Sequence, residues 1–194
     1  MTAFDPFGGE SVNASMELLR AMPDRMGEAE LIKLVLPTEF RRAGETLCAA
    51  VDELHPDAVV CLGQAGGRDA VTPERVAVNV MDARIPDNAG CRPTDTPVDP
   101  DGPAAYFSAL PIRAMAEAMT AAGTPARISD TAGTFVCNSV MYSLLRHREL
   151  RGLRIPCGFI HVPCLDELPR AEGLPSLPKE TVARGLCAAL QCII

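Results

Sequence analysis

Two unbroken apolar runs constrain the fold of this chain most strongly. The first covers residues 57–62 (Asp-Ala-Val-Val-Cys-Leu) and the second covers residues 158–162 (Gly-Phe-Ile-His-Val). A strand with one face in water alternates apolar and polar side chains, whereas a continuously apolar strand is typical of a parallel sheet covered on both faces. The two runs therefore predict buried strands of such a sheet.

Amphipathic segments alternate with the predicted strands along the chain. Helices are expected at residues 14–21, 40–54, 112–122 and 179–191, and further strands at residues 30–36, 76–80 and 126–129. This alternation predicts an α/β fold, a three-layer α/β/α sandwich whose mixed, mostly parallel sheet carries helices on both faces. Ligands of such sheets bind at the carboxyl ends of the strands. We therefore expect the glycine-rich loop at residues 63–68, the turn before Cys137 and the His161–Pro163 corner to gather at one edge.

Length and composition exclude several classes of function. A chain of 194 residues is expected to form one domain over residues 1–194. The formal net charge is −7 and no basic run is present, which argues against nucleic acid or an anionic membrane as a partner. No apolar stretch reaches the roughly 18 residues of a membrane span.

The eight cysteines do not indicate a disulfide framework or a metal site. No two of them form a C-x-x-C pair, and none has the spacing of zinc ligands. The first residues also lack the charged and apolar regions of a signal peptide. We expect free thiols in a reducing cytoplasm, with no metal and no cofactor.

The stretch around Cys137 predicts a tight turn that runs directly into a helix. Small residues at 131–134 (Thr-Ala-Gly-Thr) precede an apolar helical face, and Thr134 is the predicted N-cap. Cys137 would then lie in or beside the first turn, where the helix dipole favours a thiolate. Cys137 is therefore a candidate nucleophile. The alternative is a small buried apolar side chain, which is the commoner role of a lone cysteine.

One of the three histidines is a candidate partner for this cysteine. His161 lies in an apolar strand near its carboxyl end, whereas His55 and His147 lie at a helix end and on a charged helix face. A cysteine and a histidine in these places suit thiol catalysis, which also needs a carboxylate to orient the histidine. The pattern does not choose among the carboxylates available, which are Glu74, Asp82, Asp130 and Glu167.

Several segments, taken together and in order, resemble the pyroglutamyl-peptidase I family of cysteine peptidases. Residues 4–10 (Phe-Asp-Pro-Phe-Gly-Gly-Glu) resemble its N-terminal signature. Residues 63–68 with 72–79 (Thr-Pro-Glu-Arg-Val-Ala-Val-Asn), continued by 82–88, resemble its glutamate signature. Residues 129–138 resemble the cysteine signature, and residues 158–163 resemble the histidine signature. Because only three residues precede Phe4, the strand that the family has before its N-terminal signature is expected to be short.

The resemblance implies an activity and a set of site residues. It implies removal of N-terminal pyroglutamyl (5-oxoproline) residues from peptides through a Cys137–His161–Glu74 triad and an acyl-enzyme thioester. It also implies a homotetramer in the cytoplasm. The substrate pocket that it implies is lined by Phe4, Phe7, Gln64, Arg84, Ile85, Phe135 and Val136.

Two other functions remain open at this point. One is a non-catalytic homologue that binds peptide N-termini. The other, less favoured, is a nucleoside-phosphorylase-like enzyme that would hold phosphate in the Gly66–Arg68 loop, an interpretation based only on similar α/β architectures.

Overall fold

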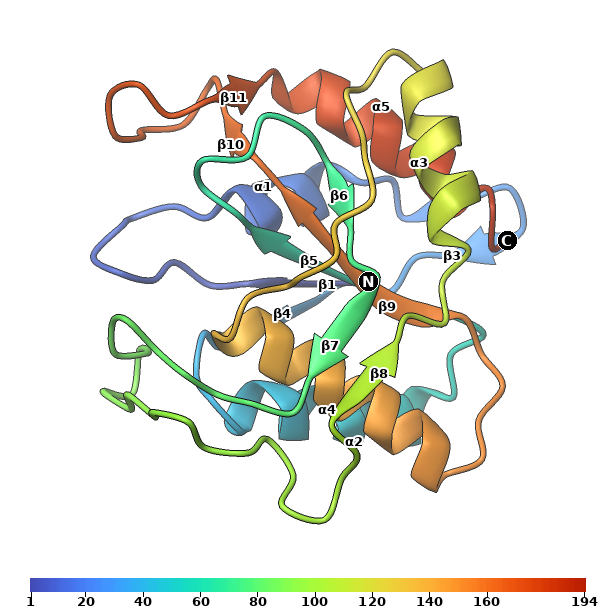
Figure 1. Ribbon diagram of the computed structural model, residues 1–194. Coiled ribbons are helices and arrows are strands. Elements are labelled where there is room, and N and C mark those ends of the chain that lie inside the picture. Colours follow the sequence, from blue (N-terminus) through green and yellow to red (C-terminus); the bar gives the residue numbers. More distant parts are fainter.

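A five-stranded sheet forms the centre of the protein in the computed structural model, which describes residues 1–194 (Figure 1). The strand order is β4-β1-β5-β9-β6, and all neighbouring pairs are parallel except β6, which runs antiparallel to β9. This confirms the expected mixed, mostly parallel sheet. The strands of the sheet are β1 (Thr2–Phe4), β4 (Leu34–Leu36), β5 (Val59–Gln64), β6 (Thr72–Pro73) and β9 (Cys157–Val162).

Helices cover both faces of the sheet, as the alternating sequence pattern predicted. The helices are α1 (Ala14–Ala21), α2 (Arg42–Leu54), α3 (Ile112–Ala121), α4 (Val136–Leu150) and α5 (Lys179–Leu190). In Figure 1, α2 and α4 lie below the sheet, and α1, α3 and α5 lie above it. No helix has both the length and the apolar character that crossing a membrane requires.

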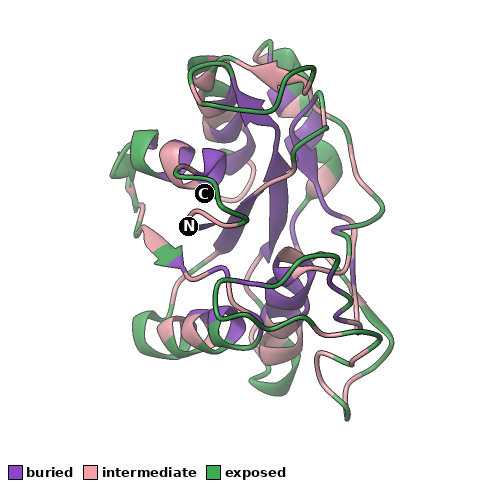
Figure 2. Cartoon of the chain, turned by 90° about the vertical axis from the view of Figure 1, so that its left-hand side faces the viewer, coloured by how far each residue is buried: buried purple, intermediate pink, exposed green.

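The two buried runs that defined the sheet in the sequence are its central strands, β5 and β9. Every residue of β9 is buried, and so is every residue of β5 up to Gly63 (Figure 2). Side chains of β9 alternate between the two apolar cores. Phe159 packs in the core under α2 and α4, and Ile160 packs in the core under α1, α3 and α5. His161 therefore projects from the sheet toward the α2/α4 layer.

Three two-stranded ribbons lie outside the central sheet. Two are antiparallel and one is parallel. They pair β2 (Arg25–Met26) with β3 (Ala29–Glu30), β7 (Val76–Val78) with β8 (Ala105–Phe107), and β10 (Cys164–Leu165) with β11 (Ser176–Leu177).

Three predicted strands differ from the structure, and the one expected at residues 76–80 ends at Val78 and pairs with β8 outside the central sheet. The strand expected at residues 30–36 is divided, because Lys33 turns away to bind the carbonyl of Met22 (2.5 Å) and the carboxylate of Asp24 (2.7 Å). Only Leu34–Leu36 joins the sheet. The segment at residues 126–129 forms isolated bridges to the chain around β6 rather than a strand, and Pro73 has no amide hydrogen to extend that ladder.

The helix predicted to begin at residue 40 begins at Arg42 instead. The φ angle of Arg41 is 63°, which is outside the helical region and excludes that residue from the helix. The other predicted helix limits agree with the structure to within one residue.

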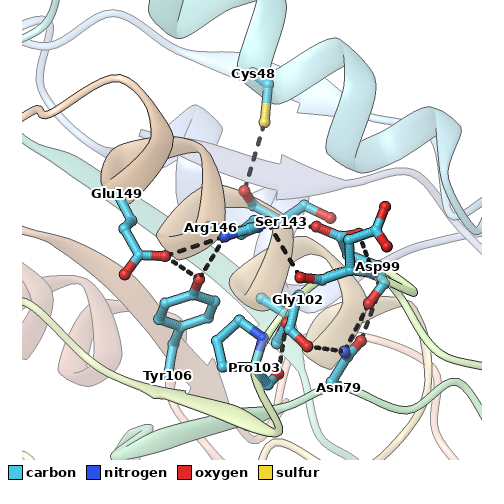
Figure 3. A network of polar contacts seen from close by, with 11 residues as sticks. Cys48, Asn79, Asp99, Gly102, Pro103, Tyr106, Ser143, Arg146 and Glu149 are labelled. Carbon is cyan, nitrogen blue, oxygen red and sulfur yellow. Dashed lines mark hydrogen bonds and ion pairs between the residues drawn. The ribbon is translucent and has the colours of Figure 1, made fainter.

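A polar network fixes the long loop between β7 and β8 to helix α4 (Figure 3). Arg146 Nε donates to Asp99 Oδ2 (2.8 Å), and Asn79 Nδ2 donates to the carbonyl of Asp99 (2.7 Å). The hydroxyl of Tyr142 donates to the carbonyl of Pro103 (2.7 Å). The loop is thus held along the carboxyl-terminal half of the helix whose first turn contains Cys137.

Asn138 connects the first turn of α4 to strand β7. Its side chain is completely buried, and Nδ2 donates to the carbonyls of Val78 (2.9 Å) and Val80 (3.0 Å). Its Oδ1 accepts the amide of Val78 (2.9 Å). These three bonds fix the helix that carries Cys137 against the chain that continues from Glu74.

Replacing Asn138 by alanine is expected to reduce the free energy of unfolding by about 3 kcal/mol, because partly buried backbone groups of Val78 and Val80 lose their partners. Urea denaturation measures the effect. Ser143→Ala on the same helix is the matched control, because the hydroxyl of Ser143 makes no hydrogen bond in the structure. Equal losses in the two variants would contradict this role of Asn138.

Candidate active site

Cys137 is the second residue of helix α4, whose first turn has no side-chain cap. The N-cap is Phe135, and the first backbone bond of the helix runs from the Ser139 amide to the Phe135 carbonyl (3.2 Å). The predicted cap, Thr134, was wrong because its hydroxyl donates to the carbonyl of Asp82 (2.7 Å). The amides of the first turn have no acceptor within the helix, so its positive end lies at Cys137.

Gly63 provides the space in which the thiol lies. A Cβ atom on Gly63 would be 2.8 Å from Cys137 Sγ and 2.7 Å from Phe159 Cζ, closer than real carbon atoms approach. Gly63 is aligned with His161 in the β5–β9 ladder. Aligned residues of neighbouring strands project to the same face. The thiol of Cys137 and the imidazole of His161 therefore share the α2/α4 face of the sheet, above adjacent strands.

Glu74 is the carboxylate that the structure brings to His161. Glu74 Oε1 lies 2.7 Å from His161 Nδ1, and both side chains are buried. The backbone holds Glu74 there, because its amide donates to the carbonyl of Phe159 on β9 (2.9 Å). A carboxylate accepts hydrogen bonds, so Nδ1 of the imidazole carries the proton and Nε2 is left as the acceptor.

The other three candidate carboxylates lie elsewhere. Asp130 is exposed and pairs with Arg75, and the carboxylate of Glu167 accepts the amide of Lys179. The side chain of Asp82 is exposed and makes no hydrogen bond or ion pair.

Arg68 also contacts Glu74, a contact that the sequence analysis did not identify. Its Nη1 lies 2.5 Å from Glu74 Oε1 and also donates to the hydroxyl of Thr72. Its Nη2 donates to the carbonyl of Thr131 (3.0 Å). The sequence places Arg68 only at the end of a glycine-rich loop. Arg68 precedes Glu74 by six residues, and this spacing does not predict a contact because the chain between them forms no regular helix or strand over most of its length.

Burial sets the protonation states of the cysteine and the histidine. It raises the pKa of the Cys137 thiol to about 12, the charges of Glu74 and Cys61 act in the same direction, and Arg68 opposes them. Burial also lowers the pKa of His161, against the raising effect of Glu74, while Arg68 lowers it further. At neutral pH the site therefore holds a neutral thiol and a neutral imidazole.

Three phenylalanines form an aromatic cluster beside the start of α4. The ring centroids of Phe7 and Phe135 are 6.0 Å apart, and Phe40 meets Phe135 edge-on at 5.2 Å. Phe7 and Phe135 are only partly buried, and Ile85 is 44% exposed. A side chain at Gly8 would touch Ile85. The cluster thus presents an apolar surface close to Cys137.

Hydrogen bonds between loops fix the position of this cluster. Asp87 is buried, and its carboxylate accepts the amides of Phe40 (2.7 Å) and Cys91 (2.7 Å). Asn88 Nδ2 donates to the carbonyl of Pro6 (2.9 Å). The loop with Ile85, the entrance to α2 and the segment with Phe7 are therefore tied together.

The remaining predicted pocket residues differ in their surroundings. Phe4 and Val136 are almost completely buried, so their side chains lie in the core beneath the site. The side chain of Gln64 points to the opposite face, where Oε1 accepts the amide of Ala14 (2.6 Å). Arg84 is exposed and forms no ion pair. No group of three or more potential ligand side chains could hold a metal ion.

Comparison with known proteins assigns the whole chain to one family. The family model described as pyroglutamyl peptidase matches residues 1–194. The chain belongs to the pyroglutamyl peptidase family. It is a hydrolase of that family, so the resemblance seen in the motifs is confirmed and the nucleoside-phosphorylase alternative is wrong.

Relatives match over most of their length. A pyrrolidone-carboxylate peptidase of Levilactobacillus brevis is 46% identical over 100% of this chain and 96% of its own. The solved structure of pyroglutamyl peptidase I from Bacillus amyloliquefaciens is 40% identical, with a TM-score of 0.95 over 99% of this chain and 94% of that chain. A mutant pyrrolidone carboxyl peptidase from Pyrococcus furiosus has a TM-score of 0.94 at 37% identity, over 99% and 95% of the two chains. These matches confirm the α/β fold.

Gly63→Ala is expected to lower kcat/KM for a pyroglutamyl amide by at least about 10²-fold, since a shift of the reacting groups by about 1 Å has that effect. The added Cβ would force Cys137 Sγ and the ring of Phe159 away from position 63. Gly66→Ala, in the turn that follows β5, is the matched control, because a Cβ there would make only ordinary contacts at 3.8 Å. A Gly63→Ala enzyme as active as the Gly66→Ala enzyme would show that the thiol does not need this space.

Proposed function

We propose that this chain removes N-terminal pyroglutamyl residues from peptides, with Cys137 as nucleophile, His161 as base and acid, and Glu74 as the group that orients His161. The observation that carries the proposal is the buried Glu74–His161 contact of 2.7 Å. The imidazole of His161 lies on the same face of the sheet as the thiol of Cys137, which packs against Gly63. A nucleophile, a base and an orienting acceptor in this order are the parts that acyl transfer needs.

The proposed reaction begins from the neutral thiol and imidazole. His161 Nε2 takes the Cys137 proton while Sγ forms a bond to the pyroglutamyl carbonyl carbon. The carbonyl oxygen becomes an oxyanion, which the free amides of the first turn of α4 stabilise. Such donors contribute about 3–4 kcal/mol each. The orienting hydrogen bond from Nδ1 to Glu74 strengthens as His161 becomes charged.

Collapse of this intermediate releases the shortened peptide. The bond from carbon to the leaving nitrogen breaks, the imidazolium gives its proton to that amine, and a thioester to Cys137 remains. Water then adds to the thioester carbonyl, with His161 as base. The carbon–sulfur bond breaks and the thiol recovers its proton, which leaves free pyroglutamic acid.

The surroundings of Cys137 fit a neutral lactam ring better than an ordinary N-terminus. Phe7, Phe135 and Ile85 offer apolar surface, and the backbone of Gln64 ends β5 at the same edge. Pyroglutamate has no ammonium group, whereas a free amine would be buried there without a partner, which is costly. In this proposal Arg84 contacts the substrate from the exposed loop. Phe4 and Val136 support the pocket from below.

Cys137→Ala is expected to abolish release of coumarin from a pyroglutamyl-coumarin amide, a loss of at least about 10³-fold. The wild-type enzyme should not cleave the prolyl and alanyl analogues. Release is followed by fluorescence under reducing conditions. Cys91→Ala is the matched control, because Cys91 is an exposed thiol outside the proposed site.

The same experiment tests the alternative of a non-catalytic homologue that binds peptide N-termini. One observation favours that alternative, namely that burial raises the pKa of the Cys137 thiol to about 12 and makes it a poor nucleophile until a base removes its proton. A folded wild-type protein that released no coumarin would support the binding protein and refute the peptidase.

The resemblance also leads us to propose one catalytic unit over residues 1–194, a homotetramer and a cytoplasmic location.

The side chain of Phe107 on β8 is 75% exposed, which is unusual for a large apolar side chain and suits a surface covered on assembly. Light scattering is expected to give four times the mass of 20.6 kDa. The mass of a single chain would refute the tetramer.

A further inference from the structure

We propose that Arg68 is a positioning residue whose fixed positive charge balances Glu74 and so leaves His161 neutral and able to accept a proton. The inference rests on the roles of Glu74 and His161 in the proposed function. It assigns a task to a residue of the glycine-rich loop that the proposed reaction steps do not use.

The carboxylate of Glu74 needs a counterion. Its side chain is completely buried, and its Oε2 has no hydrogen-bond partner in the protein. Both contacts are on Oε1, from Arg68 at 2.5 Å and His161 at 2.7 Å. A buried charge without a partner is strongly unfavourable. Only these two side chains are placed to compensate it.

Arg68 is held rigidly in this place. Besides Glu74, its guanidinium contacts the hydroxyl of Thr72 and the carbonyl of Thr131. Thr72 belongs to β6, and Thr131 belongs to the turn that leads to Cys137. Its side chain is only 23% exposed. These contacts use both terminal nitrogens of the planar guanidinium group. The single ammonium group of a lysine cannot reproduce all of them.

The two cations differ in when they are charged. Arginine is protonated throughout the working range of pH, whereas histidine gains its proton near neutrality. With Arg68 present, a protonated His161 would add a second positive charge beside a carboxylate that is already balanced. Without Arg68, the buried carboxylate would be balanced only by protonating His161. His161 could then no longer accept the proton of Cys137.

Few other titratable or charged groups face this pair. From α4 comes the thiol of Cys137, and from β5 comes the thiol of Cys61, two residues before Gly63 on the same face of the strand. On the neighbouring segments, Arg75 pairs with Asp130 and Arg127 pairs with Asp69, and both pairs are largely exposed. Solvent screens these exposed pairs. Arg68 is thus the one permanent charge in contact with Glu74.

The decisive test measures the titration of His161 by NMR in the wild type and in Arg68→Gln. The chain has only three histidines, so substitution of His55 and of His147 assigns the imidazole signals. We expect the titration midpoint of His161 to move to higher pH in Arg68→Gln and to stay near the wild-type value in Arg68→Lys. The acidic limb of the kcat/KM profile should move with it, which lowers kcat/KM on that limb about tenfold per pH unit.

The matched control is Arg75→Gln. It removes the same charge from the residue next to Glu74, but from an exposed ion pair. It should leave both the midpoint and the pH profile unchanged. An unchanged His161 midpoint in folded Arg68→Gln, or an equal shift in Arg75→Gln, would overturn the proposal. The NMR titration needs no substrate, so this failure is distinct from a failure of the wild type to release coumarin.

A second variant covers the case in which Arg68→Gln does not fold. The double variant Glu74→Gln with Arg68→Gln removes both members of the buried charge pair, which proteins tolerate better than the loss of one member. Folding of the double variant when Arg68→Gln alone fails would support the proposal. Failure of both to fold would show that Arg68 is needed for reasons other than the charge of Glu74, and would overturn it.

Discussion

The carboxylate of Glu74 is completely buried, and the groups that compensate its charge come from separate parts of the chain. His161 extends from β9, and Arg68 comes from the loop after β5. The backbone of Glu74 also bridges to Ser129, close to the turn that leads to Cys137. Because a buried charge is tolerated only when all its partners are in place, these segments have to adopt one relative arrangement. The geometry of the site and the stability of this edge of the sheet therefore depend on the same contacts.

The pairing of β5 with β9 brings the other two side chains of the site, Cys137 and His161, to the same face of the sheet. Six aligned pairs set Gly63 opposite His161, and the missing side chain of Gly63 lets the start of α4 approach the sheet. Helix α4 has no side-chain cap, because the hydroxyl of Thr134 donates to the carbonyl of Asp82 instead. An uncapped first turn reduces helix stability, but it leaves amides available near the thiol. Asn138 offsets part of that loss by bonding the backbone of β7. Departures from local stability rules are expected at functional sites.

The parts of the fold that the sequence predicted are those set by burial. Unbroken apolar runs identified β5 and β9, and amphipathic periodicity located the helices, because both patterns reflect which faces meet the core. The contact between Glu74 and His161 could not be derived this way. It depends on β6, a strand of two residues that pairs antiparallel with β9 and has too short a pattern to recognise. Only the family resemblance selected Glu74 from four carboxylates. Arg68 was missed because an arginine beside glycines is usually a solvated loop residue, and its contacts arise from tertiary structure alone.

The electrostatics of the site indicate when its charges form. Burial raises the pKa of Cys137 and lowers the pKa of His161, so the charged thiolate–imidazolium pair is not the resting state. In that resting state the free amides of α4 face a neutral thiol, and their attraction for negative charge is largely unused. In the proposed reaction, negative charge develops on the carbonyl oxygen beside those amides once Sγ attacks, while positive charge develops on His161 beside Glu74. Both interactions are stronger in the transition state than in the ground state, which is the condition for lowering the barrier. Arg68 opposes only the second of these charges. In the proposed role of Arg68, this permanent cation makes protonated His161 unfavourable, so that the imidazolium passes its proton on to the leaving amine.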